Sequence, residues 1–174
     1  MTNETLRVLK ERRSIRKFKP QQITDAELEA VLEAGIYAPS GKAKQSCTII
    51  AVQNKDDVAQ LSKMNSAILG IQTDPYYGAP TILLVLSNTE TQTPVEDGSA
   101  VTTYLTVAAA ALGLGTCWVN RERQMFESAE GKALLQKWGV AGEYTGIAAC
   151  SLGYPEGGIP APAPRKEGRI VRVK

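Results

Sequence analysis

The sequence of 174 residues contains no histidine. This absence excludes serine–histidine and cysteine–histidine nucleophilic sites, and it excludes metal sites built on imidazole ligands. It also removes the side chain that most often acts as a general acid or base near neutral pH. If the chain is an enzyme, we expect its chemistry to come from a bound organic cofactor, with no side chain as a catalytic proton donor.

Cysteine is scarce as well. The three cysteines, Cys47, Cys117 and Cys150, are far apart in the sequence, and none belongs to a C-x-x-C pair. Structural zinc sites use closely spaced pairs of such ligands, so no metal site is predicted. An odd number of cysteines in a cytosolic chain indicates buried thiols that stay reduced.

Neither sign of charge dominates the chain. Lys and Arg number 20 against 18 Asp and Glu, a net charge of +2. General nucleic-acid binders usually carry a stronger basic excess, so no nucleic-acid partner is predicted. No apolar run approaches the length of a membrane span, and the start, M-T-N-E-T-L-R, lacks the apolar segment of a signal peptide. We therefore predict a cytoplasmic protein without a membrane partner.

The composition fits one domain spanning residues 1–174, since 43% of the residues are hydrophobic. Apolar, β-branched runs predict buried strands at 47–52, 81–86 and 144–154, with a short strand or turn at 116–119. Helical periodicity and capping signals predict helices over 3–13, 24–35, from about 56, over 96–115 and over 128–138. The proline-rich end, residues 155–174, predicts an extended arm that finishes in the strand-like I-V-R-V.

The segment Glu11–Phe18, E-R-R-S-I-R-K-F, gathers three arginines and a lysine around one serine. A helical turn would place Arg12 and Arg16 on one side. Guanidinium groups bind phosphate through paired, charge-assisted hydrogen bonds, and a serine hydroxyl adds a donor. The segment is therefore interpreted either as a phosphate clamp or as a solvated basic helix end, and local sequence alone favours the second.

Five segments, taken in order, resemble the FMN-dependent nitroreductase family. They are R-R-S-I-R-K-F, A-P-S-G-K-A-K-Q-S-C, Y-Y-G-A-P-T-I-L-L-V, A-A-A-A-L-G-L-G-T-C-W, and L-G-Y-P followed by P-R-K-E-G-R-I. The resemblance covers nearly the whole chain. It implies an α+β fold with helices around a mostly antiparallel sheet. It also implies a homodimer that holds FMN at the subunit interface, with the arm completing the partner's sheet.

The same resemblance implies a set of cofactor-binding residues. The phosphate would be held by the basic segment and by one arginine of the arm: Arg12, Arg13, Ser14, Arg16 and Arg165. A loop from the partner chain would approach the flavin with Pro39, Ser40 and Gly41, followed by Gln45. The turn Leu114, Gly115 and Thr116 would lie near the flavin ring, with Asn120 just beyond, and Asn65 lies on a segment that often reaches the flavin.

Several of these residues have a plainer structural interpretation. Gly115 would allow close packing, Ser40 would serve a turn, and Arg165 would be solvated. The chain also departs from the family's pattern at Ala43 and Cys47, where an asparagine and a tryptophan are usual. These departures bear on flavin affinity and on the choice of substrate.

Three functions are compatible with the sequence, and they are given in the order in which the sequence favours them. The first is an oxidoreductase in which NADH or NADPH reduces FMN, and the flavin then reduces a small acceptor such as a nitroaromatic or a quinone in a ping-pong cycle. The second is a non-catalytic or redox-sensing flavin-binding protein of the same fold. The third is a binder of nucleic acid or an acidic partner through the basic segment. No feature of the sequence selects the physiological acceptor, or NADH over NADPH.

Overall fold

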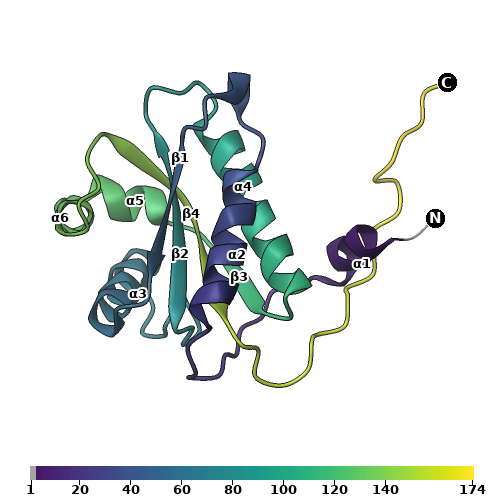
Figure 1. Cartoon of the computed structure of the whole chain (residues 1–174), viewed down its shortest axis with the longest axis horizontal. Helices are drawn as coiled ribbons and strands as arrows, with labels where there is room; N and C mark the ends of the chain where they lie inside the picture. Colours follow the sequence, from purple (N-terminus) through teal and green to yellow (C-terminus); the bar gives the residue numbers. More distant parts are fainter. Residues whose placement is uncertain (1–2) are drawn as a thin grey trace.

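A four-stranded antiparallel sheet forms the centre of the computed structural model, which describes residues 3–174 (Figure 1). Its strands run in the order β1 (Cys47–Val52), β2 (Thr81–Asn88), β4 (Tyr144–Gly153) and β3 (Gly115–Val119). Met1 and Thr2, which begin the predicted domain, lie outside the described residues. The predicted α+β fold with an antiparallel sheet is confirmed.

Helices cover both faces of the sheet (Figure 1). One face carries α2 (Asp25–Ile36) and α4 (Pro94–Ala111), and the other carries α3 (Lys55–Leu69), α5 (Glu122–Glu127) and α6 (Ala129–Lys137). Alternate residues of β2 serve the two layers, because successive side chains of a strand point to opposite faces. Ile82, Leu84 and Leu86 pack toward α3 and α5, whereas Leu83 and Val85 pack toward α2 and α4.

The helix predicted over 24–35 begins as its capping signal indicates. Thr24 and Glu27 form the reciprocal capping box of α2, in which the Thr24 hydroxyl accepts from the Glu27 N–H at 3.2 Å. The helix predicted from about 56 begins at Lys55 with Asn54 as its N-cap, and α3 extends to Leu69. The 3₁₀ turn η1 (Gly41–Ala43) lies in the loop that contains Pro39, Ser40 and Gln45.

The helix predicted over 3–13 ends two residues early, and the helical turn that would have placed Arg12 and Arg16 on one side is absent. Helix α1 (Glu4–Glu11) ends before Arg12, and the chain then runs extended. The Ile15 N–H donates to the Thr116 carbonyl at 2.8 Å, so a pairing with a distant strand replaces local helix. The helix predicted over 128–138 is confirmed as α6, with Ser128 as its N-cap, whereas the short helix α5 before it was not predicted.

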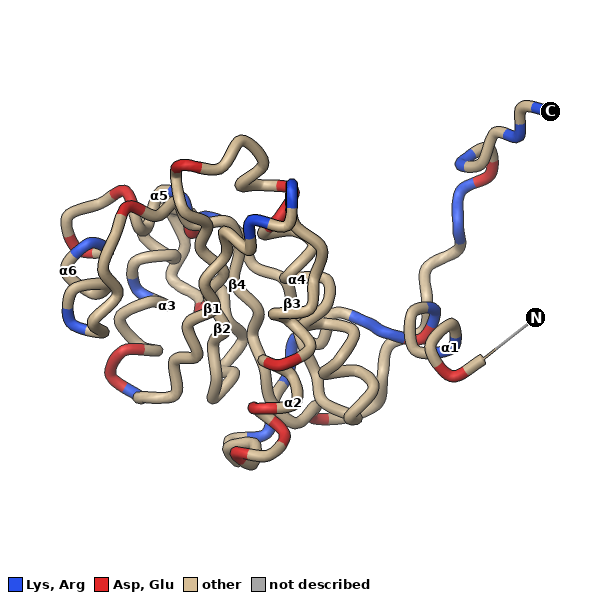
Figure 2. Tube along the Cα trace, turned by 45° about the horizontal axis from the view of Figure 1, so that its top comes forward, with Lys and Arg blue, Asp and Glu red and all other residues tan. Residues whose placement is uncertain are grey.

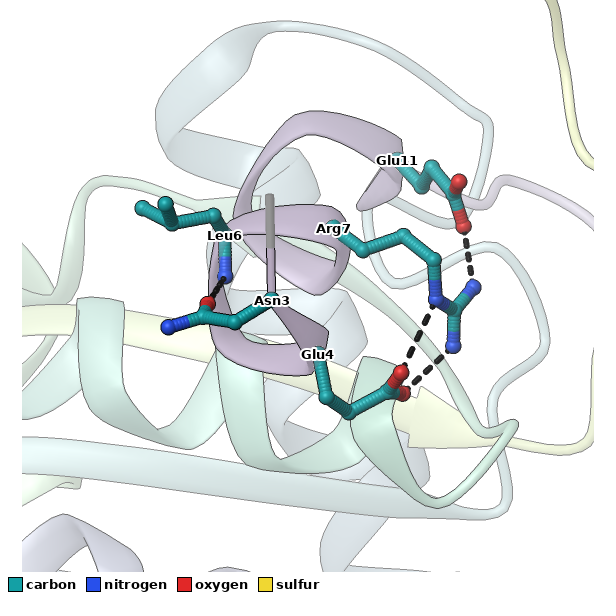
Figure 3. Close-up of polar contacts among 5 residues, drawn as sticks. All are labelled: Asn3, Glu4, Leu6, Arg7 and Glu11. Atoms are coloured by element: carbon teal, nitrogen blue, oxygen red, sulfur yellow. Dashed lines mark hydrogen bonds and ion pairs between the residues drawn. The ribbon is translucent and has the colours of Figure 1, made fainter. Parts of the chain in front are cut away.

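Helix α1 and the C-terminal arm stand outside the two-layered body (Figure 1). Within α1, Asn3 accepts from the Leu6 N–H, and Arg7 pairs with Glu4 and Glu11 at 2.5 Å each (Figure 3). The arm runs past α1 and outward, and its Ile170, Val171 and Val173 side chains are at least 80% exposed. Among the described residues, no helix is both long and apolar enough to cross a membrane.

Candidate functional site

The basic segment lies along the start of β3. Ser14 bridges to Thr116 in parallel register, and Phe18 bridges to Pro155 at the root of the arm. Gly115 permits this approach, because a Cβ there would lie 3.0 Å from three side-chain atoms of Ile15. The structure thus brings together the predicted residues of the basic segment and the turn: Arg12, Ser14, Arg16, Leu114, Gly115 and Thr116.

Arg16 and its neighbours surround the buried thiol of Cys117. The Arg16 guanidinium carbon lies 5.8 Å from the centre of the Tyr77 ring, and the contact with Tyr77 raises the pKa of Arg16. Burial raises the pKa of Cys117, while Arg16, Tyr77, Ser14 and Arg12 act in the opposite direction. These cationic and hydroxyl groups therefore share one surface at the edge of the sheet.

This surface has no anionic partner of its own. Within residues 3–174, the ion pairs join Arg7 to Glu4 and Glu11, and Lys137 to Asp57, so neither Arg12 nor Arg16 is paired. Figure 2 shows Lys and Arg along the strip that joins α1 to the body and again along the arm. Guanidinium groups without carboxylate partners are suited to bind an external anion.

Arg13 is turned toward α1 instead. Its Nη1 donates to the carbonyls of Lys10 at 2.7 Å and Arg12 at 2.6 Å, which satisfies the end of the helix. Its Nε is buried without a hydrogen-bond partner among the described residues. Arg13 thus fixes where α1 ends, beside the arginines that remain available.

The loop Pro39–Gln45 is anchored at the other end of α4. Asp97 of α4 accepts from the Gly41 N–H at 2.8 Å, from Ser46 at 2.9 Å and from Thr93 at 3.1 Å. Burial alone would raise the pKa of Asp97, but these hydrogen bonds outweigh it and lower the pKa. A buried carboxylate therefore holds the loop in one conformation.

The loop backbone is unusual for residues other than glycine. Lys42, Ala43 and Gln45 have φ of 53°, 54° and 50°, all in the left-handed region. The Ser40 hydroxyl accepts from the Gln45 N–H at 2.9 Å, so the turn role foreseen for Ser40 is present. Pro39 and Gln45 are exposed, as a residue offered to another chain would be.

One chain does not bring its loop to its own basic segment. Asp97 and Ala110 lie near opposite ends of α4, about 20 Å apart at 1.5 Å per residue. Ala110 lines a small cavity of about 130 Å³ with Arg12 and Arg13, whereas Asp97 holds the loop. Figure 1 shows η1 beside the start of α4 and α1 near its end.

Arg165 lies on the exposed arm. Among residues 3–174, no hydrogen bond or ion pair joins it to the basic segment. A larger hollow of about 810 Å³ follows α3 and the loop 71–80, and none of the predicted cofactor residues lines it. In the single chain, the predicted residues thus form separate surfaces without a common enclosed cavity.

Asn65 lies in the core, in a polar cluster that the sequence analysis did not foresee. Its Nδ2 donates to the Asn120 carbonyl at 3.0 Å, and its Oδ1 accepts from Arg121 Nε at 2.7 Å. The cluster includes Glu122, which is fully buried. Burial raises the pKa of Glu122 to about 7, against the lowering effect of its own N–H, Tyr76 and Arg121. Within N-R-E-R-Q, nothing distinguishes this glutamate from a solvated one.

Comparisons with known proteins show the family to which this fold belongs. The model of the Nitroreductase family matches residues 9–75, which include the basic segment and the anchored loop. A protein of Archaeoglobus fulgidus, provisionally named NADH dehydrogenase/NAD(P)H nitroreductase, is 32% identical over 159 residues, covering 88% of this chain and 86% of its own. The chain belongs to the nitroreductase family.

Solved nitroreductases share the whole fold. The Bacteroides fragilis nitroreductase with bound FMN superposes with a TM-score of 0.91 at 29% identity, covering 99% of this chain and 100% of its own. The FMN-bound nitroreductase of Desulfitobacterium hafniense gives 0.89 at 26% identity, with both chains fully covered. The resemblance that five sequence segments carried is thus confirmed, and family membership supports an oxidoreductase role.

Proposed function

We propose that this chain is an FMN-dependent oxidoreductase that uses NADH or NADPH to reduce small acceptors such as nitroaromatics or quinones. The observation that carries the proposal is the unpaired cationic surface of Arg12, Ser14 and Arg16, held against the turn Leu114–Thr116. The FMN-bound relatives of the same fold support the choice of cofactor. Family membership supports the redox chemistry.

The donor set fits FMN. A phosphate monoester carries nearly two negative charges near neutral pH and accepts several hydrogen bonds. Arg12, Ser14 and Arg16 offer two cations and a hydroxyl from a segment whose backbone is fixed on β3. When bound, FMN would supply two-electron transfer, which no side chain of this histidine-free protein provides.

The chain's own residues would bind, orient and stabilise charge. Arg12, Ser14 and Arg16 would hold the phosphate together with Arg165, with Arg13 fixing the adjacent end of α1. The turn Leu114, Gly115 and Thr116 would lie beside the flavin ring, where backbone N–H groups and nearby cations stabilise negative charge. Asn65, on α3, would act on the same region through Asn120.

We further propose that the working protein is a cytoplasmic homodimer with two shared sites. Pro39, Ser40, Gly41 and Gln45 would reach the flavin from the partner chain, because the loop lies at the far end of α4 from its own basic segment. The arm, residues 155–174, would lie on the partner and bury the apolar side chains that it exposes in the single chain. Ile170–Val173 would then pair with the edge of the partner's sheet.

The reaction would follow a ping-pong order. The reduced nicotinamide would deliver its electrons and leave, and the acceptor would then take its place in the same opening. Neither the reductive nor the oxidative half-reaction needs a histidine, and water would supply protons to the acceptor. The protein would contribute position and charge stabilisation.

Anaerobic spectroscopy of the purified protein tests this proposal. The protein should be yellow, and NADH or NADPH should bleach the flavin before an acceptor is added. A quinone or nitroaromatic added afterwards should restore the colour, with parallel lines in double-reciprocal plots. A flavin that stays oxidised with both nicotinamides would contradict the reductase function and favour the flavin-binding alternative. A colourless protein that binds no FMN would contradict both.

A further inference from the structure

A buried polar cluster lies behind the end of β3. Asn65 from α3, Tyr76 from the loop before β2, and Glu122 from α5 are all fully buried. The Tyr76 hydroxyl lies 3.3 Å from Glu122 Oε1 and 3.3 Å from Asn65 Nδ2, and Asn65 Nδ2 lies 3.5 Å from Glu122 Oε1. Three segments that are distant in the sequence therefore meet at one carboxyl group.

The second oxygen of that carboxyl has no partner. Glu122 Oε2 is buried and makes no hydrogen bond to any described residue. An ionised carboxylate buried in this state is costly, whereas a protonated one is far less so. The ionisable groups that face it are Arg121 before it in the chain, Tyr76 from the loop and Cys150 from β4. Of these, only Arg121 is a cation, and its Nε is already bound to Asn65.

The position of Glu122 is fixed from behind by β4. A Cβ at Gly146 would lie 2.2 Å from the Glu122 carbonyl oxygen, so glycine allows the α5 backbone to rest directly on the strand. The Glu122 side chain itself is fully buried, so its carboxyl group does not reach solvent. Ionisation of this carboxyl group must therefore change its contacts with Tyr76 and Asn65.

The groups that it touches hold the chain just after β3. Asn65 Nδ2 donates to the Asn120 carbonyl at 3.0 Å, and Arg121 Nε donates to Asn65 Oδ1 at 2.7 Å. Arg121 has a φ of 90°, an uncommon value for a residue other than glycine, and such a conformation persists only where its surroundings enforce it. In the described structure, the hydrogen bonds of this cluster hold Arg121 in that conformation.

We propose that Glu122 is a positioning residue of the flavin site, acting through Asn65: in its protonated form it keeps the Asn120–Arg121 turn in place, and its ionisation loosens that turn. The inference rests on the proposed function, because β3 and its flanking turns form the ring side of the proposed site. It gives the histidine-free chain a group that responds to pH near neutrality. Glu122 would not touch the flavin.

The direction of the effect follows from the pKa. Burial raises the pKa of Glu122 to about 7 from an ordinary value of 4.5, so the folded protein binds this proton more tightly than the unfolded chain. The corresponding contribution to stability is complete below pH 4.5 and is lost as the pH rises through about 7. The turn, and with it the affinity for FMN, should weaken over the same window.

The test measures the FMN dissociation constant of the apoprotein, by quenching of flavin fluorescence, across the pH range on either side of neutral. In the parent protein the constant should rise with pH, by at most about tenfold per pH unit, the limit for one linked proton. Glu122→Gln should remove this dependence and keep the tight affinity of the protonated parent. Glu127→Gln, which changes an exposed carboxylate on the same helix, should leave the parent's profile intact.

A second variant separates positioning from general support of the core. Asn65→Leu removes both hydrogen bonds to the turn, so this variant should bind FMN weakly, with a dissociation constant that does not depend on pH. The FMN dissociation constants of both variants should thus be independent of pH, with tight binding by Glu122→Gln and weak binding by Asn65→Leu. The melting temperature of the apoprotein, which needs no flavin, should fall less with rising pH in Glu122→Gln than in the parent.

The outcomes separate the two proposals. A Glu122→Gln protein that keeps the parent's pH profile for FMN would overturn the positioning role and leave the proposed function standing. Weak binding by Glu122→Gln at every pH would also overturn it, since a neutral isostere should bind well. A parent that binds no FMN at any pH would overturn the proposed function itself, and the positioning role with it.

Discussion

The two ends of α4 are organised in opposite ways. At its start, the buried side chain of Asp97 accepts three hydrogen bonds: one from Gly41 in the loop Pro39–Gln45, one from Ser46 just after the loop, and one from Thr93, which precedes α4. Near its end, the basic segment is held by its backbone, through the bridges of Ser14 to Thr116 and Phe18 to Pro155. At the start of α4, the charged side chain is used in hydrogen bonds within the chain. Near its end, the charged side chains remain available to bind a ligand.

This contrast is what a site shared between two copies of the chain would require. The fixed loop presents its residues outward, and the basic segment presents cations without partners. Because α4 keeps them about 20 Å apart, a ligand that contacts both would need a second copy of the chain. The predictions below compare the two ends of α4, and the first concerns the arm, which would hold the two copies of the chain together.

Removing residues 160–174 should have the largest effect. Ile170, Val171 and Val173 are almost fully exposed in the single chain, and burial on a partner would contribute about 1.5 kcal/mol each. The loss of one arm should weaken the dimer on the order of a thousandfold, and the loss of both arms should weaken it further and release FMN. Light scattering and flavin absorbance would measure both. A truncated chain that stays a flavin-loaded dimer would show that the arm has another role.

Arg16→Ala should weaken FMN binding next. A charge-assisted contact contributes about 1.5–3 kcal/mol, so the dissociation constant should rise about 10- to 150-fold. Lys17→Ala is the matched control, because Lys17 is an exposed cation of the same segment. It should change the constant by about threefold at most. Equal affinities for the two variants would mean that Arg16 does not hold the phosphate.

Asp97→Asn should loosen the opposite end of α4. An amide cannot accept from Gly41, Ser46 and Thr93 as a carboxylate does, so we expect a loss of about 1–3 kcal/mol in unfolding free energy. Because hydrogen bonds lower the pKa of Asp97, its contribution is present above pH 3.8 and is lost as the pH falls below that value. Urea unfolding of both proteins at neutral and acid pH would measure this, and a constant difference between them would contradict it.

Arg7→Ala should have the smallest effect. Both ion pairs of Arg7 on α1 are exposed to solvent, where screening and side-chain entropy offset the attraction. The melting temperature should stay within about 1 °C of the parent. FMN affinity should be unchanged, since Arg7 is neutralised by Glu4 and Glu11. A large loss of affinity would place α1 itself in the site.

Sequence reasoning predicted those parts of the fold that depend on neighbouring residues. The apolar runs of β1, β2 and β4 and the capping box of α2 are local signals, and the structure confirms them. The helical turn that would have placed Arg12 and Arg16 on one side is absent because a distant strand, at Thr116, takes the Ile15 N–H. Spacing along the chain carries no information about such a pairing.

The candidate site was predicted unevenly for the same reason. Resemblance to a family suggested the basic segment, the loop and the turn, and the structure brings the basic segment and the turn together. Glu122 and its burial were missed, because a short polar run around a glutamate is typical of a solvated helix start. Its role depends on Tyr76, Asn65 and Gly146, which meet only in the folded chain.

Complementation between two defective chains tests most directly whether each site is shared by two copies. One chain carries Arg16→Ala, and the other carries Gly41→Val, whose side chain would collide with Thr93, since a Cβ there lies 2.4 Å from its hydroxyl oxygen. Differently tagged chains are allowed to exchange, and the mixed dimer is purified. In a shared arrangement, one site has both defects and the other has neither. We predict that the mixed dimer binds FMN tightly at half the parent's occupancy, whereas either variant alone binds weakly. Weak binding by the mixed dimer would show that loop and arginines act within one chain, and would contradict the account.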